Sequence, residues 1–228
     1  LMTAMLNAIR ALTDPATAGA VCIALPQDVQ AECYDWPVSF LQKRVHRIPR
    51  ACPEAETVGQ AAKIIRAAKK PLVICGGGVK YAEAGATLQH FCEVFGIPFA
   101  ETQAGKSAVA GGCVLNLGGI GVTGNLAANT IAANADCIIA VGSRLSDFTT
   151  SSKWLFHENA RVVGINTSRF PAETLDACAG VAAAKAGLAA LPTAPGQRGY
   201  RTAYLEEISR PRPAWAADRQ RRAAYRHT

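Results

Sequence analysis

Residues 115–125, Leu-Asn-Leu-Gly-Gly-Ile-Gly-Val-Thr-Gly-Asn, precede an apolar run at 137–141 and the segment Gly-Ser-Arg-Leu-Ser-Asp-Phe-Thr-Thr-Ser-Ser-Lys-Trp at 142–154. Positions 119–124 fit the GxGxxG pattern of dinucleotide sites. That pattern should close the first strand of a βαβ unit and precede an acidic residue at the end of the next strand. Here Asp136 opens the next strand, and two strand–helix units come earlier. The context therefore argues against a plain NAD fingerprint.

Helices and strands alternate on both sides of this stretch. Glu54 and Glu56 open a helix, and Arg66, Lys69 and Lys70 close it, as the helix dipole prefers. The elements that follow are strands at 71–75, 98–102, 137–141 and 162–165, and helices at about 81–95, 124–134 and 181–190. This order predicts an α/β domain over 54–192, with a doubly wound, mostly parallel sheet and helices on both faces.

Ligands of such domains bind beyond the carboxyl ends of the strands. The segments expected there are 76–78, 102–107, 142–148 and 166–170. Gly105-Lys106-Ser107 has the ending of a P-loop, but Ala100 replaces the required upstream glycine, so the P-loop motif fails.

The chain outside 54–192 is less regular. Residues 2–12 predict a helix and 19–25 a buried strand, while 30–53 is polar and contains three prolines. The last 32 residues hold eight Arg against three acidic residues, a local net charge of +5. A basic arm can bind nucleic acid, but a solvated surface helix or linker is the favoured interpretation, because no recognition fold accompanies the arginines. The prolines in 209–213 should break a helix there.

Composition narrows the class of protein. The 228 residues are half apolar and carry a net charge of +7, with eight cysteines and four histidines. The cysteines are spread singly without a CxxC, and the histidines have no i,i+4 partner, so neither a zinc site nor a disulfide framework is expected. A reducing cytoplasm fits this usage. No apolar run approaches a membrane span and no signal segment opens the chain, and we expect a fragment because Leu1 begins mid-helix.

The helix–strand–Gly-Gly-Gly unit, the glycine-rich stretch and Gly-x-Arg-x-x-Asp together resemble the central domain of thiamine-diphosphate-dependent enzymes. Within that family, three segments are similar to the branch that hydrolytically opens a cyclic 1,2-dione in myo-inositol catabolism: 101–107, 115–125 and 147–154. The resemblance covers about 2–192 and implies a DHS-like domain of the NAD/FAD-binding type. It also implies an order of parts: 1–29 as the end of a pyrimidine-binding domain, 30–53 as a linker, 54–192 as the central domain, and 193–228 as a basic linker toward a diphosphate-binding domain.

The resemblance implies where the chemistry resides. In whole enzymes of this family, thiamine diphosphate lies between two other domains, one supplying a glutamate and the other a Gly-Asp-Gly…Asn motif for Mg²⁺. Gly-Asp-Gly does not occur in this chain. We therefore expect no catalytic and no metal-binding residue here, and an inert fragment of a cytoplasmic, homo-oligomeric hydrolase. That parent enzyme would use thiamine diphosphate and Mg²⁺ to open a small polyol-derived dione, and would need its pyrimidine and diphosphate domains as partners.

Some relatives bind FAD or ADP in this domain, so two alternatives follow: an acetolactate-synthase-like enzyme, or a free-standing FAD/ADP-binding module. The matching positions are Gly76, Gly77, Gly78, Gly142 and Arg144. FAD is nevertheless not expected, because Asn166, Arg169 and Ala184 stand where FAD-binding relatives carry acidic residues. Without those acids the ribose and adenine sides would go unrecognised.

Three charged residues follow strands within the segments that carry the resemblance: Lys106, Asp147 and Lys153. We expect them on interdomain or substrate-side loops. The hydroxyl groups around Asp147 could contact a polyol-derived substrate or a neighbouring domain, but runs of this kind more often form caps and turns.

Overall fold

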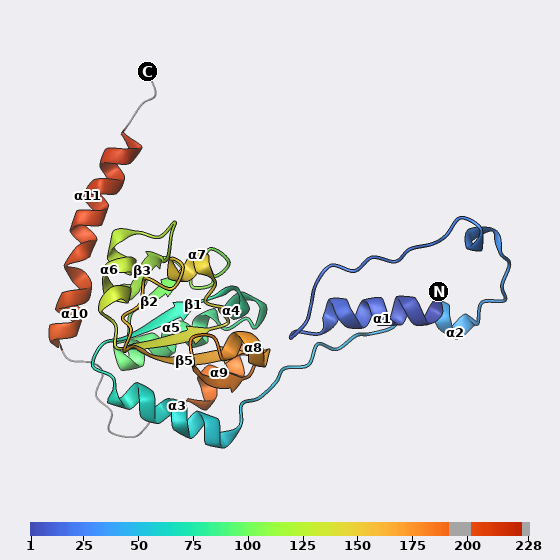
Figure 1. Cartoon of the computed structure of the whole chain (residues 1–228), viewed down its shortest axis with the longest axis horizontal. Helices are drawn as coiled ribbons and strands as arrows, with labels where there is room; N and C mark the ends of the chain where they lie inside the picture. The colour runs from blue at the N-terminus through green and yellow to red at the C-terminus, as the bar shows by residue number, and fades with distance from the viewer. Residues whose placement is uncertain (192–201, 225–228) are drawn as a thin grey trace. The chain divides into compact units, whose positions relative to one another are not determined.

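The computed structural model describes residues 1–191 and 202–224, which fall into two compact units, Leu1–Arg50 and Ala51–Thr228 (Figure 1). Each unit is considered by itself. In the second, six strands form one sheet in the order β3-β2-β1-β4-β5-β6, and every neighbouring pair is parallel. The strands are β1 (Pro71–Cys75), β2 (Phe99–Glu101), β3 (Asn116–Gly119), β4 (Cys137–Val141), β5 (Arg161–Asn166) and β6 (Cys178–Val181). The order confirms the predicted doubly wound parallel sheet.

The strand residues alternate between two buried faces. Val73 and Cys75 point into a core shared with α3 (Ala55–Ala67), α5 (Gly85–Phe95) and α9 (Ala184–Ala190). Leu72 and Ile74 point the other way, into a core shared with α6 (Leu126–Asn134) and α10 (Thr202–Ser209). Burial on both faces explains why β1 and β4 are continuous apolar runs. The prediction of helices on both faces is confirmed, and Figure 1 shows α3 and α9 on one side of the sheet and α6 on the other.

Several elements differ from the sequence-based expectation. The helix expected at about 81–95 is α5, which begins only at Gly85, and a separate short helix, α4 (Gly77–Tyr81), precedes it. Between the two helices Glu83 has a left-handed conformation with φ +51°. β3 lies within the stretch expected to be a loop, and β6 was not expected at all. Both are short strands at the edges of the sheet, and their glycines give no strand signal.

The basic tail contains two helices among its described residues. Tyr204 and Ile208 of α10 are buried in the same core as Leu72 and Ile74. Arg210 separates α10 from α11 (Pro211–Ala223), which lies beside α6. The predicted break is present, and both prolines fall in the first turn of α11, where a missing N–H is tolerated.

The first unit contains α1 (Met2–Thr13), η1 (Val29–Ala31) and α2 (Val38–Leu41). The helix expected at 2–12 is confirmed. The buried strand expected at 19–25 is wrong: these residues are irregular and mostly exposed. The described part of this unit offers no other strand, and a strand needs a hydrogen-bonded neighbour.

None of the helices that the structure describes is long and apolar enough to cross a membrane.

Candidate functional site at the carboxyl edge of the sheet

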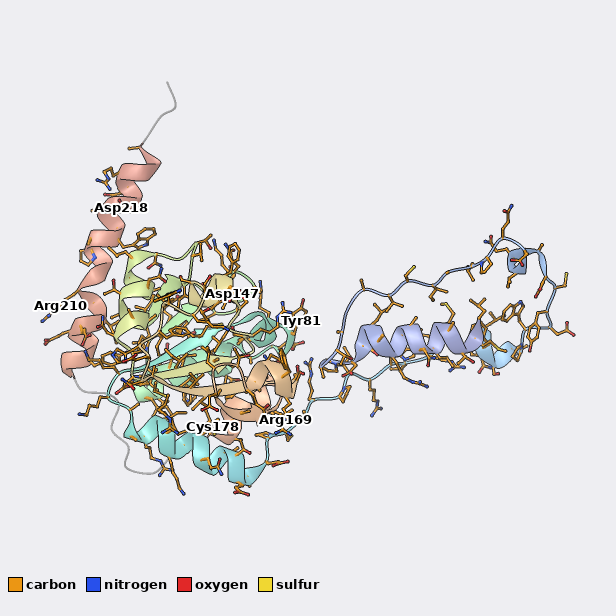
Figure 2. The ribbon with its side chains drawn as sticks, viewed as in Figure 1. Tyr81, Asp147, Arg169, Cys178, Arg210 and Asp218 are labelled. Atoms are coloured by element: carbon orange, nitrogen blue, oxygen red, sulfur yellow. The ribbon has the colours of Figure 1, made fainter. Side chains whose placement is uncertain are left out.

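The carboxyl ends of β1 and β4 meet at the centre of the sheet. From β1 the strand order runs outward through β2 to β3, and from β4 it runs the opposite way through β5 to β6. This reversal is the switch point at which doubly wound folds bind ligands. In Figure 2, Tyr81, Asp147 and Arg169 lie along this side of the domain, on helices that follow β1, β4 and β5, while Arg210 and Asp218 lie on the opposite side.

The two glycine loops at the switch point pack against each other. The Gly76 N–H donates to Val141 O at 2.9 Å, and the Gly78 N–H donates to Gly142 O at 2.9 Å. A Cβ on Gly76 would overlap Gly142 O, and a Cβ on Gly142 would lie 2.6 Å from Gly78 Cα. Gly142 also has φ +59°, which favours glycine. The N–H groups of Gly76 and Gly78 thus bind protein carbonyls, and close approach of two loops accounts for the glycines.

The other positions compared with nucleotide-binding relatives form bonds within the protein, lie in the core or are exposed. Asn166 Nδ2 donates to Ser143 O at 3.1 Å and so ties the end of β5 to the end of β4. Arg169 lies in α8 (Arg169–Ala172) and pairs with Glu173 at 2.5 Å on the surface. Ala184 is buried in the core at the start of α9. Arg144 is exposed beside the glycine loops.

Lys106, Asp147 and Lys153 are all exposed in segments that follow strands, Lys106 after β2, and Asp147 and Lys153 after β4. Two hydrogen bonds connect the loops that carry them. Gln103 Nε2 donates to Thr123 Oγ1 at 3.1 Å, and the Val122 N–H donates to Phe148 O at 2.9 Å. The β2 exit, the glycine-rich stretch and α7 (Asp147–Thr150) therefore form one connected rim.

Lys153 lies on a strained turn that follows α7, the helix that Asp147 begins. Ser151, Ser152 and Lys153 have φ values of +49°, +56° and +71°, an uncommon run for residues other than glycine. The turn is fixed from below by the fully buried Thr150, whose Oγ1 accepts the Lys153 N–H at 3.0 Å. The Ser152 N–H donates to Asp147 O at 2.8 Å. Such strain persists where the surroundings hold it, and it is concentrated at functional sites.

The same edge contains a buried carboxylate that the sequence-based reasoning did not single out. Glu101 ends β2 with only 8% of its surface exposed, and its Oε1 has no hydrogen-bond partner among the described residues. Burial raises the pKa of Glu101; hydrogen bonds from Asn116 and the Ser107 backbone, and the charges of Lys106 and Lys80, oppose that rise. The sequence feature that could have revealed Glu101 is a charged residue at the end of an apolar strand. A buried carboxyl with a raised pKa is a recognised mark of functional sites.

Cys75 lies opposite Glu101 in the register of β1 and β2. Burial raises the pKa of its thiol to about 12, the Glu101 charge adds to the rise, and Lys80 opposes it. The thiol is therefore protonated at neutral pH. Cys75 belongs to the core and has no nucleophilic role.

Comparison with known proteins identifies the domain. The family described as "Thiamine pyrophosphate enzyme, central domain" matches residues 58–191. Proteins named 3D-(3,5/4)-trihydroxycyclohexane-1,2-dione hydrolase are similar along 97% of this chain: 58% identical in Geobacillus thermodenitrificans, 53% in Clostridium tetani and 52% in Bacillus cereus. The chain spans about a third of their length, 34% in each case. Together with the parallel sheet and its glycine loops, these matches show that the chain belongs to the thiamine pyrophosphate enzyme family and carries its central domain.

Proposed function

We propose that this chain is the central part of a longer thiamine-diphosphate-dependent hydrolase that opens the ring of trihydroxycyclohexane-1,2-dione in inositol catabolism. The observation that carries the proposal is the identity of 52–58% with hydrolases of that name, maintained over 97% of the chain. The match extends beyond residues 58–191, so both structural units take part in it. A likeness limited to the α/β fold would indicate no particular reaction.

The residues described here do not fit thiamine diphosphate with Mg²⁺. Diphosphate binding would need free backbone N–H groups or a metal held by oxygen ligands. Gly76 and Gly78 direct their N–H groups to protein carbonyls. Among the described residues, no group of three or more His, Cys, Asp or Glu side chains is placed to hold a metal. We therefore assign the binding of thiamine diphosphate and Mg²⁺ to other parts of the enzyme, and no chemical step to this chain.

The proposed contribution of the chain is to position its neighbours. Lys106, Asp147 and Lys153 project from a connected rim at the sheet edge where ligands of this fold gather. We assign them to interdomain or substrate-side contacts in a homo-oligomer that acts on a polyol-derived dione. The proposed order of parts is 1–29 for the pyrimidine domain, 30–53 for a linker, 54–192 for the central domain and 193–228 toward the diphosphate domain. Eight unpaired cysteines support a cytoplasmic location.

A chimera tests the proposal. The matching third of the Geobacillus thermodenitrificans hydrolase is replaced by this chain, and ring opening of trihydroxycyclohexane-1,2-dione is measured against the unmodified relative. We expect turnover from the chimera. A chimera that folds and assembles like the relative but opens no ring would contradict the proposed function.

The same chimera tests the rim residues. Lys106→Ala, Asp147→Ala and Lys153→Ala should lower turnover or weaken assembly, because misplacing a catalytic part by an ångström can cost about a hundredfold in rate. Lys63→Ala, at an exposed position of α3, is the matched control and should leave both unchanged. If all three rim variants behave like the control, these loops have no part in the activity.

A further inference from the structure

Aromatic side chains are exposed along the carboxyl edge of the sheet. Among the described residues of the second unit, four aromatic side chains are exposed: Tyr81 at 83%, Phe148 at 63%, Trp154 at 89% and Phe170 at 88%. They follow β1, β4 and β5, which are neighbours in the sheet. Figure 2 shows Tyr81 on the same side of the domain as the residues that directly precede Phe148 and Phe170. Exposed apolar surface that is gathered on one face marks an interaction site.

The position of Trp154 is fixed by the residues on both sides of it. Its N–H donates to Ser151 O at 3.2 Å, and the Leu155 N–H donates to Thr150 O at 3.0 Å. Leu155 and Phe156 pack against the core on the α6 side of the sheet, so the chain turns inward directly after Trp154. The indole therefore lies in solvent on an anchored backbone. Anchoring of this kind lowers the entropy cost of binding a partner.

The backbone of Phe148 is fixed by the neighbouring glycine-rich stretch. The Val122 N–H donates to Phe148 O at 2.9 Å, and Gly121 lies so close to that oxygen that a Cβ would overlap it. Both ends of the Asn129 amide bind Gly121: the Gly121 N–H donates to Asn129 Oδ1, and Asn129 Nδ2 donates to Gly121 O, each at 2.9 Å. Phe148 is thus presented by a segment that hydrogen bonds hold in place, with the exposed Val122 beside it.

The charges around these side chains indicate which kind of surface they fit. In segments 76–84, 102–108 and 142–156, the exposed charged residues are mostly basic: Lys80, Lys106, Arg144 and Lys153 against Glu83 and Asp147. A twofold contact between copies of this chain would pair this basic face with itself. Like charges disfavour such a contact, whereas a face that combines apolar and acidic side chains complements it. The charges therefore favour a different domain over a second copy.

The length of the relatives provides a source for such a domain. The chain spans 34% of the hydrolases that it matches, which leaves about two thirds of their length outside it. We propose that Tyr81, Phe148, Trp154 and Phe170 form the surface on which another domain of the same enzyme docks, through an apolar face flanked by acidic side chains. This docking surface rests on the proposed function, because the docking domain belongs to the proposed longer hydrolase.

Hydroxyl-radical footprinting with mass spectrometry tests the docking surface without any substitution. The 228-residue chain and the chimera with the Geobacillus thermodenitrificans hydrolase are oxidised under the same radical dose. Trp154 should react about tenfold more slowly in the chimera, because a docked domain excludes water from the core of the interface. Phe148 and Phe170 should also be protected. His90, which is exposed on α5, is the reference and should change by less than about twofold.

Substitutions separate docking from a structural role within the domain. Trp154→Ser and Phe148→Ser should leave the melting temperature of the isolated chain unchanged, because both side chains are exposed there. In the chimera each should lower the melting temperature and restore the oxidation of the remaining edge aromatics. Val114→Ser is the matched control: Val114 is 74% exposed but precedes β3, at the opposite edge of the sheet. It should change neither protein.

Several results would overturn the docking surface. One is Trp154 oxidation that is as fast in the chimera as in the isolated chain, whether or not the chimera assembles. Another is Trp154 already protected in an isolated chain that sediments as a dimer, which would assign the face to a second copy. A third is equal destabilisation of both proteins by Trp154→Ser. The outcome is distinct from that of the proposed function: protected aromatics in an inactive chimera would reject only the proposed reaction, and reactive aromatics in an active chimera would reject only the docking surface.

Discussion

Gly76 and Gly142 illustrate how a residue pattern that is typical of phosphate binding can serve packing. Their loops belong to β1 and β4, which are neighbours in the sheet but about 66 positions apart in the sequence. Each loop leaves space only for a hydrogen atom at the other's glycine. Glycine is required wherever two backbones approach this closely.

This contact predicts opposite outcomes for two glycine-to-alanine substitutions. Gly76→Ala places a methyl group against Gly142 O and should lower the free energy of unfolding by about 1–3 kcal/mol. Gly59→Ala is the matched control: Gly59 lies inside α3 with nothing within 4 Å of an added Cβ. It should raise stability by about 0.5–1 kcal/mol through helix propensity. Urea denaturation measures both, and equal effects of the two changes would reject the packing argument.

At the residue scale, sequence reasoning located the glycines but not their partner. A Gly-Gly-Gly after an apolar strand predicts a tight turn at the end of that strand, whether a ligand or another loop packs against it. Only the strand order brings Gly142 to it, and that order is set by contacts between distant segments. Glu101 was missed for the same reason: it is buried where β2 lies between β1 and β3, and that strand order is not visible in the sequence.

At the scale of elements, the strands that the sequence predicts are those buried on both faces. β1 and β4 are apolar throughout because helices cover both of their faces, and the sequence predicts their bounds. The edge strands β3 and β6 are half-exposed and contain glycine, so they carry no such pattern. The burial of α10 was likewise not visible in the sequence, because it comes from contacts with the distant strand β1.

The attachment of α10 predicts the effect of one hydroxyl group. Tyr204 is buried, and its hydroxyl donates to Pro71 O at 2.8 Å. Tyr204→Phe should lower the free energy of unfolding by about 0.5–1.5 kcal/mol, since Pro71 O loses that donor. The nearby Lys70–Glu207 ion pair, at 2.8 Å, is partly exposed and should contribute less.

Tyr34→Phe provides the control, because Tyr34 is an exposed tyrosine in the first unit. Its loss of a hydroxyl should leave the unfolding of the second unit unchanged. A Tyr204→Phe protein as stable as the wild type would show that α10 is not held by this hydrogen bond.

At the scale of the whole molecule, the two units predict a pattern of proteolysis. Lys43, Arg44, Arg47 and Arg50 are exposed in irregular chain at the end of the first unit. Trypsin should cut there before it cuts at Lys153, which is equally exposed but lies in a turn fixed by Thr150. Mass spectrometry over a time course gives the order of cleavage. Early cuts between 70 and 165 would contradict the compact second unit.

Ligand binding by the isolated chain is the last prediction, and it follows from where the backbone donors point. A diphosphate entering the switch point would compete with the carbonyls of Val141 and Gly142 for the N–H groups of Gly76 and Gly78. Breaking those bonds would leave buried carbonyls unpaired, a cost that one exposed arginine, Arg144, would not offset. Calorimetry should therefore detect no binding of thiamine diphosphate above background, with or without Mg²⁺, and FAD should not copurify. Micromolar, Mg²⁺-dependent binding would show that the loops separate in solution, and a yellow preparation would restore the nucleotide-binding alternative.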